Sequence, residues 1–261
     1  MFALARPDRV NVGLSLCSAT LIAPTVLLTA AHCVTIEPGD GSDTIQDPSE
    51  FFVTAGEEVA SLAEDVAVDA IEVHPDYIAG TAHRDLAVVL LADDATALAG
   101  GLVMPVARSI EAGHLDLERG VDIVGHGGAD FPEPYGPREQ AGIGSRMHLP
   151  HVLDDFGCTS PDDPACASRE LVLTWDNSPE AGFCGGGDGG ALLVFRDAQG
   201  KPSAAPWQYL EHSSPIPPGG SMALAGVVSR VDAGEDGCTG EGIAARVDTA
   251  MAFIEPFLDA D

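Results

Sequence analysis

Short apolar runs follow one another along the whole chain and are separated by clusters of Gly, Pro and Asp. In the segment 10–22, Val10, Val12, Leu14 and Leu16 alternate with small or polar residues, a pattern typical of a half-buried strand. Further strand-like runs are expected at 51–56, 66–74, 85–91, 121–127, 170–175, 191–195 and 223–231. Many short strands with turn residues between them predict an all-β barrel or sandwich.

The end of the chain has a different period. In "DTAMAFIEPFLDA" (248–260), Met251, Ile254 and Leu258 recur at helical spacing, and Asp248 stands where an N-cap is expected. We therefore expect a C-terminal helix. Two long segments, 132–166 and 196–221, are dense in Pro, Gly and Asp and are expected to be loops, while 108–120 has the composition of a linker.

The net charge of the chain argues against two classes of binding partner. The formal net charge is −29, with 41 acidic residues against 12 basic ones. A surface this negative repels nucleic acid phosphates and anionic membranes, so neither is expected as a partner. No apolar run approaches the roughly 20 residues that a membrane helix needs, and "MFALARPDRV" lacks the apolar stretch of a secretory signal.

Six cysteines form an even set without any CxxC pair. Zinc ligation usually uses close Cys or His pairs on tight turns, so three disulfides in an oxidising compartment are the better interpretation. The cysteines therefore favour a secreted or periplasmic protein.

Two short motifs carry candidate chemistry. "LLTAAHCV" places His32 beside Cys33, and "HRDLAVVLL" places Asp85 at the head of a strand. A histidine and a buried carboxylate make a general base and its orienting partner, because the carboxylate fixes the tautomer and stabilises the imidazolium. Taken alone, each residue also fits a structural role, as a packed histidine or a turn aspartate.

The surrounding sequence resembles the trypsin-like serine peptidases. "CSATLIAPTVLLTAAHC" is similar to the segment that holds the family's catalytic histidine, and "IEVHPDY" followed by "DLAVVLL" to the approach to its aspartate. "VDIVGHGG", "LAGVVS" and "GIAARVDTAMAFIEPFL" resemble, in the right order, the start of the second half, a later strand and the closing strands and helix.

This resemblance implies a single domain over 1–261. Two packed six-stranded antiparallel β-barrels are expected, at about 1–107 and about 120–261, with a C-terminal α-helix and a site in the cleft between them. The implied disulfides are Cys17–Cys33, Cys184–Cys238 and Cys158–Cys166.

The nucleophile loop departs from the family pattern. "FCGGGDGGALL" (183–193) contains no serine. Without gaps, Gly186 keeps the oxyanion-hole position, Gly187 replaces the loop aspartate, and Asp188 takes the serine position, where its backbone N–H would also belong to the oxyanion hole. With a gap, Asp188 is the loop aspartate and the serine is lost.

An aspartate at the serine position would place His32 between Asp85 and Asp188. Each carboxylate favours the imidazolium, so His32 is expected to titrate above its usual value near 6.5. We therefore expect a pseudopeptidase that binds a peptide or protein as a monomer. The alternative is an active serine-type endopeptidase that cleaves after small or apolar residues.

The resemblance also locates a specificity pocket, at Gly182, Ser229, Val231 and Gly242. Gly182 at its base argues against a preference for Lys or Arg, and Gly242 is expected to leave one wall open. No cofactor is expected. Glu57 and Glu64 fall where some relatives bind calcium, but two solvated acids on a very acidic surface are the better interpretation. His148 and His151 could hold a metal, but a loop with two exposed histidines is the commoner outcome.

Overall fold

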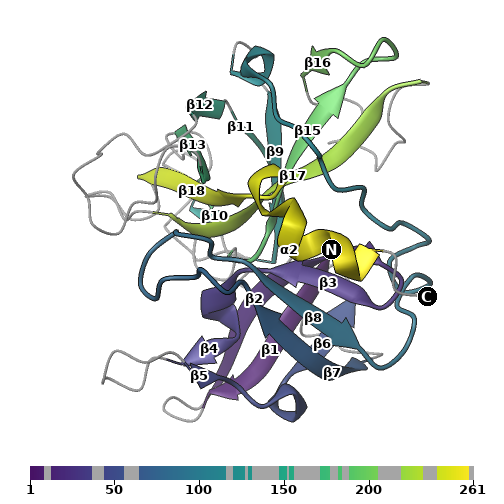
Figure 1. Ribbon diagram of the computed structural model, residues 1–261, viewed down its shortest axis with the longest axis vertical. Helices are drawn as coiled ribbons and strands as arrows, with labels where there is room; N and C mark the ends of the chain where they lie inside the picture. Colours follow the sequence, from purple (N-terminus) through teal and green to yellow (C-terminus); the bar gives the residue numbers. More distant parts are fainter. Residues whose placement is uncertain are drawn as a thin grey trace.

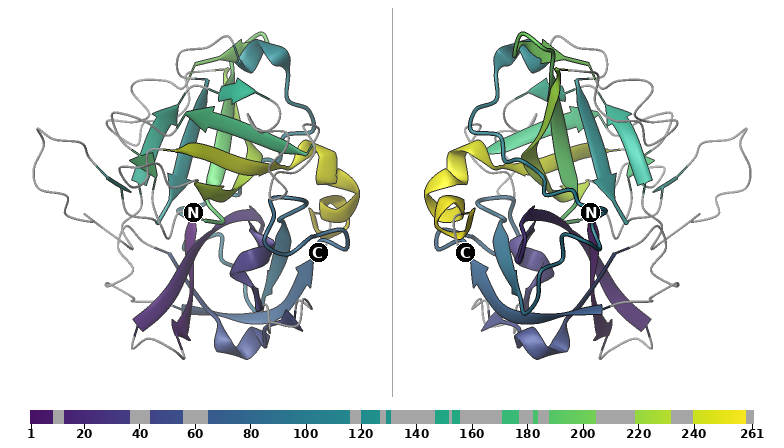
Figure 2. Two further views of the ribbon diagram at one scale, coloured as in Figure 1. Left: turned by 90° about the vertical axis from the view of Figure 1, so that its left-hand side faces the viewer. Right: turned by 90° about the vertical axis from the view of Figure 1, so that its right-hand side faces the viewer.

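Two β-sheets, one in each half of the chain, make up most of the fold in this computed structural model, with the C-terminal helix at their junction (Figures 1 and 2). The structure describes residues 1–8, 13–36, 44–55, 65–115, 120–126, 129–130, 147–151, 153–155, 171–176, 182–183, 188–204, 219–231 and 240–258. Within these ranges no helix is long and apolar enough to cross a membrane.

The first sheet is a closed barrel of six antiparallel strands in the order β1-β2-β3-β8-β7-β6, in the lower half of Figure 1. Its strands are β1 (Phe2–Asp8), β2 (Gly13–Ala23), β3 (Val26–Thr29), β6 (Phe52–Ala55), β7 (Asp65–Val73) and β8 (Ala87–Leu91). Every residue of β3 is buried, so both faces of this strand are covered. The barrel closes because β1 pairs with both β2 and β6.

The second sheet follows the order β11-β9-β15-β17-β18-β13-β12. Its strands are β9 (Val121–Gly125), β11 (Met147–His151), β12 (Leu153–Asp155), β13 (Val172–Asp176), β15 (Ala191–Arg196), β17 (Ser221–Val231) and β18 (Glu241–Arg246). The terminal strands β11 and β12 are separated in sequence by residue 152 alone, so the chain itself joins the two ends of the sheet. Among the described residues, only the first sheet is closed by strand pairing into a barrel.

Shorter elements complete the described chain. Three further strand pairings join β4 (Thr35–Ile36) to β5 (Thr44–Ile45), β10 (Ala129–Asp130) to β14 (Gly182–Phe183), and β16 (Pro202–Ser203) to β15. The 3-10 helices are η1 (Ala31–Cys33), η2 (Pro48–Glu50), η4 (Ala112–His114) and η5 (Asp248–Ala250).

Strand β15 shows how the two sheets share the core. Ala191, Leu193 and Phe195 belong to a cluster that also contains the buried residues of the first barrel. The intervening Leu192 and Val194 belong to a second cluster inside the second sheet. Because successive side chains of a strand point to opposite faces, β15 packs against both cores at once.

The predicted C-terminal helix is present as η5 and α2 (Met251–Leu258). Ile254 is fully buried, and Met251 and Leu258 pack against the core of the first barrel. The expected N-cap is wrong. The carboxylate of Asp248 instead accepts two hydrogen bonds from Arg246, at 3.0 and 2.8 Å, and no side chain caps η5.

The mostly β architecture confirms the predicted fold class, but three details differ from the sequence expectations. Strand β1 was not expected, and its pairing with β2 and β6 closes the first barrel. Strands β11 and β12 lie inside the segment 132–166, which was expected to be a loop. The segment 196–221 contributes β16 as well as the end of β15 and the start of β17.

Candidate active site

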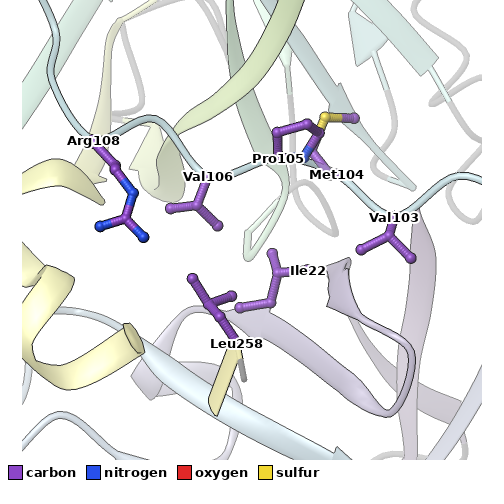
Figure 3. Close-up of a pocket in the computed structure, with 7 residues that line it drawn as sticks. All are labelled: Ile22, Val103, Met104, Pro105, Val106, Arg108 and Leu258. Atoms are coloured by element: carbon purple, nitrogen blue, oxygen red, sulfur yellow. The ribbon is translucent and has the colours of Figure 1, made fainter. Parts of the chain in front are cut away.

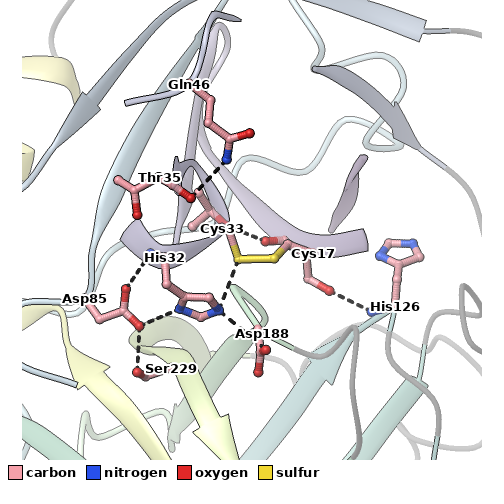
Figure 4. The surroundings of a disulfide bond; sticks show 11 residues. Cys17, His32, Cys33, Thr35, Gln46, Asp85, His126, Asp188 and Ser229 are labelled. Carbon is pink, nitrogen blue, oxygen red and sulfur yellow. Dashed lines mark hydrogen bonds and ion pairs between the residues drawn. A yellow bond between two sulfur atoms is a disulfide. The ribbon is translucent and has the colours of Figure 1, made fainter. Parts of the chain in front are cut away.

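His32 lies in η1, directly after the fully buried strand β3, and the disulfide Cys17–Cys33 ties η1 to β2. Its Nδ1 lies 2.8 Å from Oδ2 of Asp85, and its backbone N–H donates to Oδ1 of the same carboxylate at 2.9 Å (Figure 4). Both oxygens of Asp85 thus contact His32, which fixes the orientation of the imidazole.

Asp85 is 1% exposed and stands just before β8. A third donor reaches it from the second sheet, because Oγ–H of Ser229 donates to Oδ2 at 2.6 Å. A carboxylate buried this deeply requires such partners to remain ionised. From the sequence, Ser229 is expected in the specificity pocket, and this assignment stays a prediction. What the structure adds is the contact of its side chain with Asp85, 144 residues away, which no local pattern indicated.

Asp188 faces His32 from the opposite side. Its Oδ2 lies 3.4 Å from Nε2 of His32, and the two side chains are 36% and 35% exposed. The backbone holds it there, because Ser18 N–H donates to the Asp188 carbonyl at 2.7 Å, and Gly189 N–H donates to Val228 O at 2.8 Å. The imidazole therefore stands between two carboxylates, as the sequence predicted.

This arrangement changes the charge of His32. Burial lowers the pKa of the imidazole, but the negative charges of Asp85 and Asp188 and the side-chain hydrogen bond to each of them outweigh burial and raise the pKa from 6.5 to about 10. The imidazole is therefore predominantly protonated at neutral pH.

The sequence of the chain matches a known family. A family model described as trypsin matches residues 5–254. The chain belongs to the trypsin family. A curated relative, "Serine protease Hayan" of Drosophila melanogaster, is 36% identical over 83 residues. That segment is 30% of this chain and 12% of the relative, so the chain covers only a small part of the relative's length.

A buried indole lies beside Gly242, one of the residues that the sequence resemblance places in the specificity pocket. Gly242 pairs with Val231 on one side and with Trp175 on the other, so the three residues form a row across adjacent strands. Trp175 is fully buried, and a Cβ on Gly242 would collide with its indole ring. The indole fills the space that Gly242 was expected to leave open. Gly182 lies in β14, paired with Asp130.

Several candidates lie outside the described residues: Gly186, Cys158, Cys166, Cys184, Cys238, Glu57 and Glu64. The side chains of His148 and His151 are likewise not described. Ligand atoms of Cys17, His32 and Cys33 lie within 4.8 Å of one another, but both sulfur atoms belong to the disulfide and are not available to a metal.

A separate hollow of about 340 Å³ lies between the segment 103–108, β2 and the end of the C-terminal helix (Figure 3). Six apolar residues and one arginine line it: Ile22, Val103, Met104, Pro105, Val106, Arg108 and Leu258. None of these residues belongs to the site around His32.

Proposed function

We propose that this trypsin-family domain is a pseudopeptidase, which binds a peptide or protein partner in the cleft around His32 and does not hydrolyse it. The supporting observation is the position of Asp188. Its carboxylate lies 3.4 Å from Nε2 of His32, where a general base would meet the hydroxyl of a nucleophile.

The charge that Asp85 and Asp188 impose on His32 also supports the proposal. A general base must offer a free electron pair on Nε2. With a pKa of about 10, only about one molecule in a thousand carries neutral His32 at pH 7. A carboxylate is also a weak nucleophile towards an amide. Loss of the nucleophile in a comparable triad lowers turnover by about 10⁶.

The disulfide supports a proposal for the compartment. Cys17–Cys33 fits an oxidising environment, in which disulfides form and persist. We propose a secreted or periplasmic protein that acts as a monomer. The net charge of −29 makes nucleic acid and anionic membranes unfavourable partners.

A fluorophosphonate probe tests the proposal, since it labels only an activated serine. The unmodified protein should remain unlabelled, and Asp188→Ser should gain labelling that is lost again in Asp188→Ser/His32→Ala. Labelling of the unmodified protein would establish the alternative, an active serine endopeptidase with a serine from elsewhere in the chain.

The titration of His32 is the second readout. Its midpoint, followed by NMR, should lie near pH 10 in the unmodified protein. A midpoint near 6.5 would contradict the carboxylate contact even if no labelling occurred.

A further inference from the structure

The residue before Asp85 has an unusual backbone. Arg84 has φ = 51°, and it is the single non-glycine with positive φ among the described residues. This left-handed conformation is unfavourable for a residue with a side chain and persists only where the surroundings hold it. The contacts of Arg84 therefore bear on how Asp85 is placed.

Arg84 is held from the far end of the chain. Its Nη1 donates to the backbone carbonyl of Thr249 at 2.7 Å and is 2.9 Å from Oγ1 of the same residue. Thr249 belongs to η5, at the start of the C-terminal helix, and its Oγ1 also contacts Arg246 O at 3.2 Å. The 3-10 turn thus presents two acceptors to one guanidinium group.

The backbone on the other side of Asp85 is fixed as well. Leu86 N–H donates to Arg84 O at 2.7 Å, which closes a three-residue turn with Asp85 at its centre. Leu86 O accepts from His74 N–H at 2.9 Å, and the ring of His74 packs on that of Phe253 in α2, with centroids 4.9 Å apart. Both flanks of Asp85 therefore lead to the C-terminal segment.

We propose that Arg84 is a positioning residue. By bonding Thr249, it couples the C-terminal 3-10 turn and helix to the orientation of Asp85, and through Asp85 to that of His32. The proposal does not depend on the pseudopeptidase function, because the hydrogen bond between Asp85 and His32 would serve an inert site and an active one alike.

NMR titration of His32 separates positioning from simple charge. Loss of a nearby cation would by itself raise the pKa of His32. Displacement of Asp85 would lower it, since an opposite charge at close range shifts a pKa by about one unit or more. In Arg84→Ala we therefore expect the pKa of His32 to fall by about one unit, and the low-field signal of the proton between Nδ1 and Asp85 to weaken.

His74 reports the loss of charge in the same spectra. Burial lowers its pKa first, and the charge of Arg84 lowers it further. Its pKa should therefore rise in Arg84→Ala while that of His32 falls. Opposite movements of the two histidines cannot arise from charge removal alone.

Two further variants keep the test decisive if Arg84→Ala does not fold, as judged by circular dichroism. Thr249→Val removes one acceptor without a change of charge and should shift His32 in the same direction by a smaller amount. Arg84→Lys keeps the cation, so the pKa of His32 should fall less in this variant than in Arg84→Ala.

Arg108→Ala is the matched control, because Arg108 also ties the helix to the body, through Glu255 Oε1 at 2.7 Å, without bordering Asp85. It should leave His32 unchanged. The proposal is overturned if His32 keeps its titration and its low-field signal in both Arg84→Ala and Thr249→Val. An equal shift in Arg108→Ala would also overturn it.

Discussion

The backbone N–H of Ser18 donates to the carbonyl oxygen of Asp188 at 2.7 Å, across the junction of the two sheets. Ser18 is fully buried beside the disulfide, and its other polar groups are used too. Its Oγ accepts from His126 N–H at 2.8 Å, and its carbonyl accepts from Thr29 Oγ1 at 2.7 Å. Strand β2, which carries Cys17 and Ser18, therefore holds the backbone of Asp188 in place.

Gly189, the next residue, packs closely against Ser18 and Thr29. It has φ = +77°, and a Cβ would collide with Ser18 O and Thr29 Oγ1. We expect Gly189→Ala to lower the free energy of unfolding by about 3 kcal/mol, from backbone strain and displacement of Ser18 together. Gly200 has the same φ of +77° with nothing within 4 Å. Gly200→Ala should therefore cost about 1 kcal/mol, from strain alone. If urea titrations gave the same loss of unfolding free energy for Gly189→Ala and Gly200→Ala, the close contact of Gly189 with Ser18 and Thr29 would be refuted.

Asp188→Asn should lower the pKa of His32, because one of the two carboxylates that raise it becomes neutral. The raised pKa means that His32 stabilises the fold fully below pH 6.5, and that this contribution disappears as pH rises through about 10. The stability difference between the unmodified protein and Asp188→Asn should thus be largest in mild acid and shrink towards pH 10. Asp93→Asn, at an exposed acid, serves as the control. A pH-independent difference would count against the ion pair.

Ser229→Ala removes a hydrogen bond to a buried carboxylate. Bonds to charged groups contribute about 1.5–3 kcal/mol, so we expect a loss of about 2 kcal/mol in the free energy of unfolding. Ser221→Ala, on the same strand but exposed, should be nearly neutral. If the two variants melt alike, Ser229 does not support Asp85 in solution.

His114 makes the linker sensitive to acid. It is fully buried in η4, and Glu111 N–H donates to its Nδ1 at 3.3 Å. Burial lowers its pKa, and the charge of Arg196 lowers it further. Its neutral form therefore supports the fold above pH 6.5, and this support is lost as pH falls below that value. Denaturation curves of His114→Leu should show a weaker acid dependence than those of the unmodified protein. An unchanged acid dependence would contradict the prediction.

Much of the first half was predictable from the sequence. The runs that became β2, β7 and β8 alternate or are wholly apolar, and the order of the motifs around His32 and Asp85 indicated that the two residues meet. Strand β1 was missed because "FALARPD" contains a charge and a proline next to one another. β11 and β12 were missed because Pro150 and the Pro- and Gly-rich flanks hide a pairing that only the neighbouring β9 and β13 stabilise.

The details of the site were harder to predict from the sequence. That Asp188 faces His32 followed from the alignment of the loop. A serine within an apolar strand, by contrast, carries no sign of a partner 144 residues away, so the role of Ser229 was not predicted. Gly242 was misinterpreted because a missing side chain indicates space but not what fills it, and the indole of Trp175 comes from the next strand.

The contact between Asp188 and His32 has a consequence for the resting protein. A working serine peptidase carries a protonated histidine beside a new negative charge only briefly, while the tetrahedral intermediate exists. Here the imidazolium and a neighbouring anion persist in the free protein at neutral pH. The free domain therefore carries the same pair of neighbouring charges, an imidazolium and an anion, that a serine peptidase carries only in its tetrahedral intermediate.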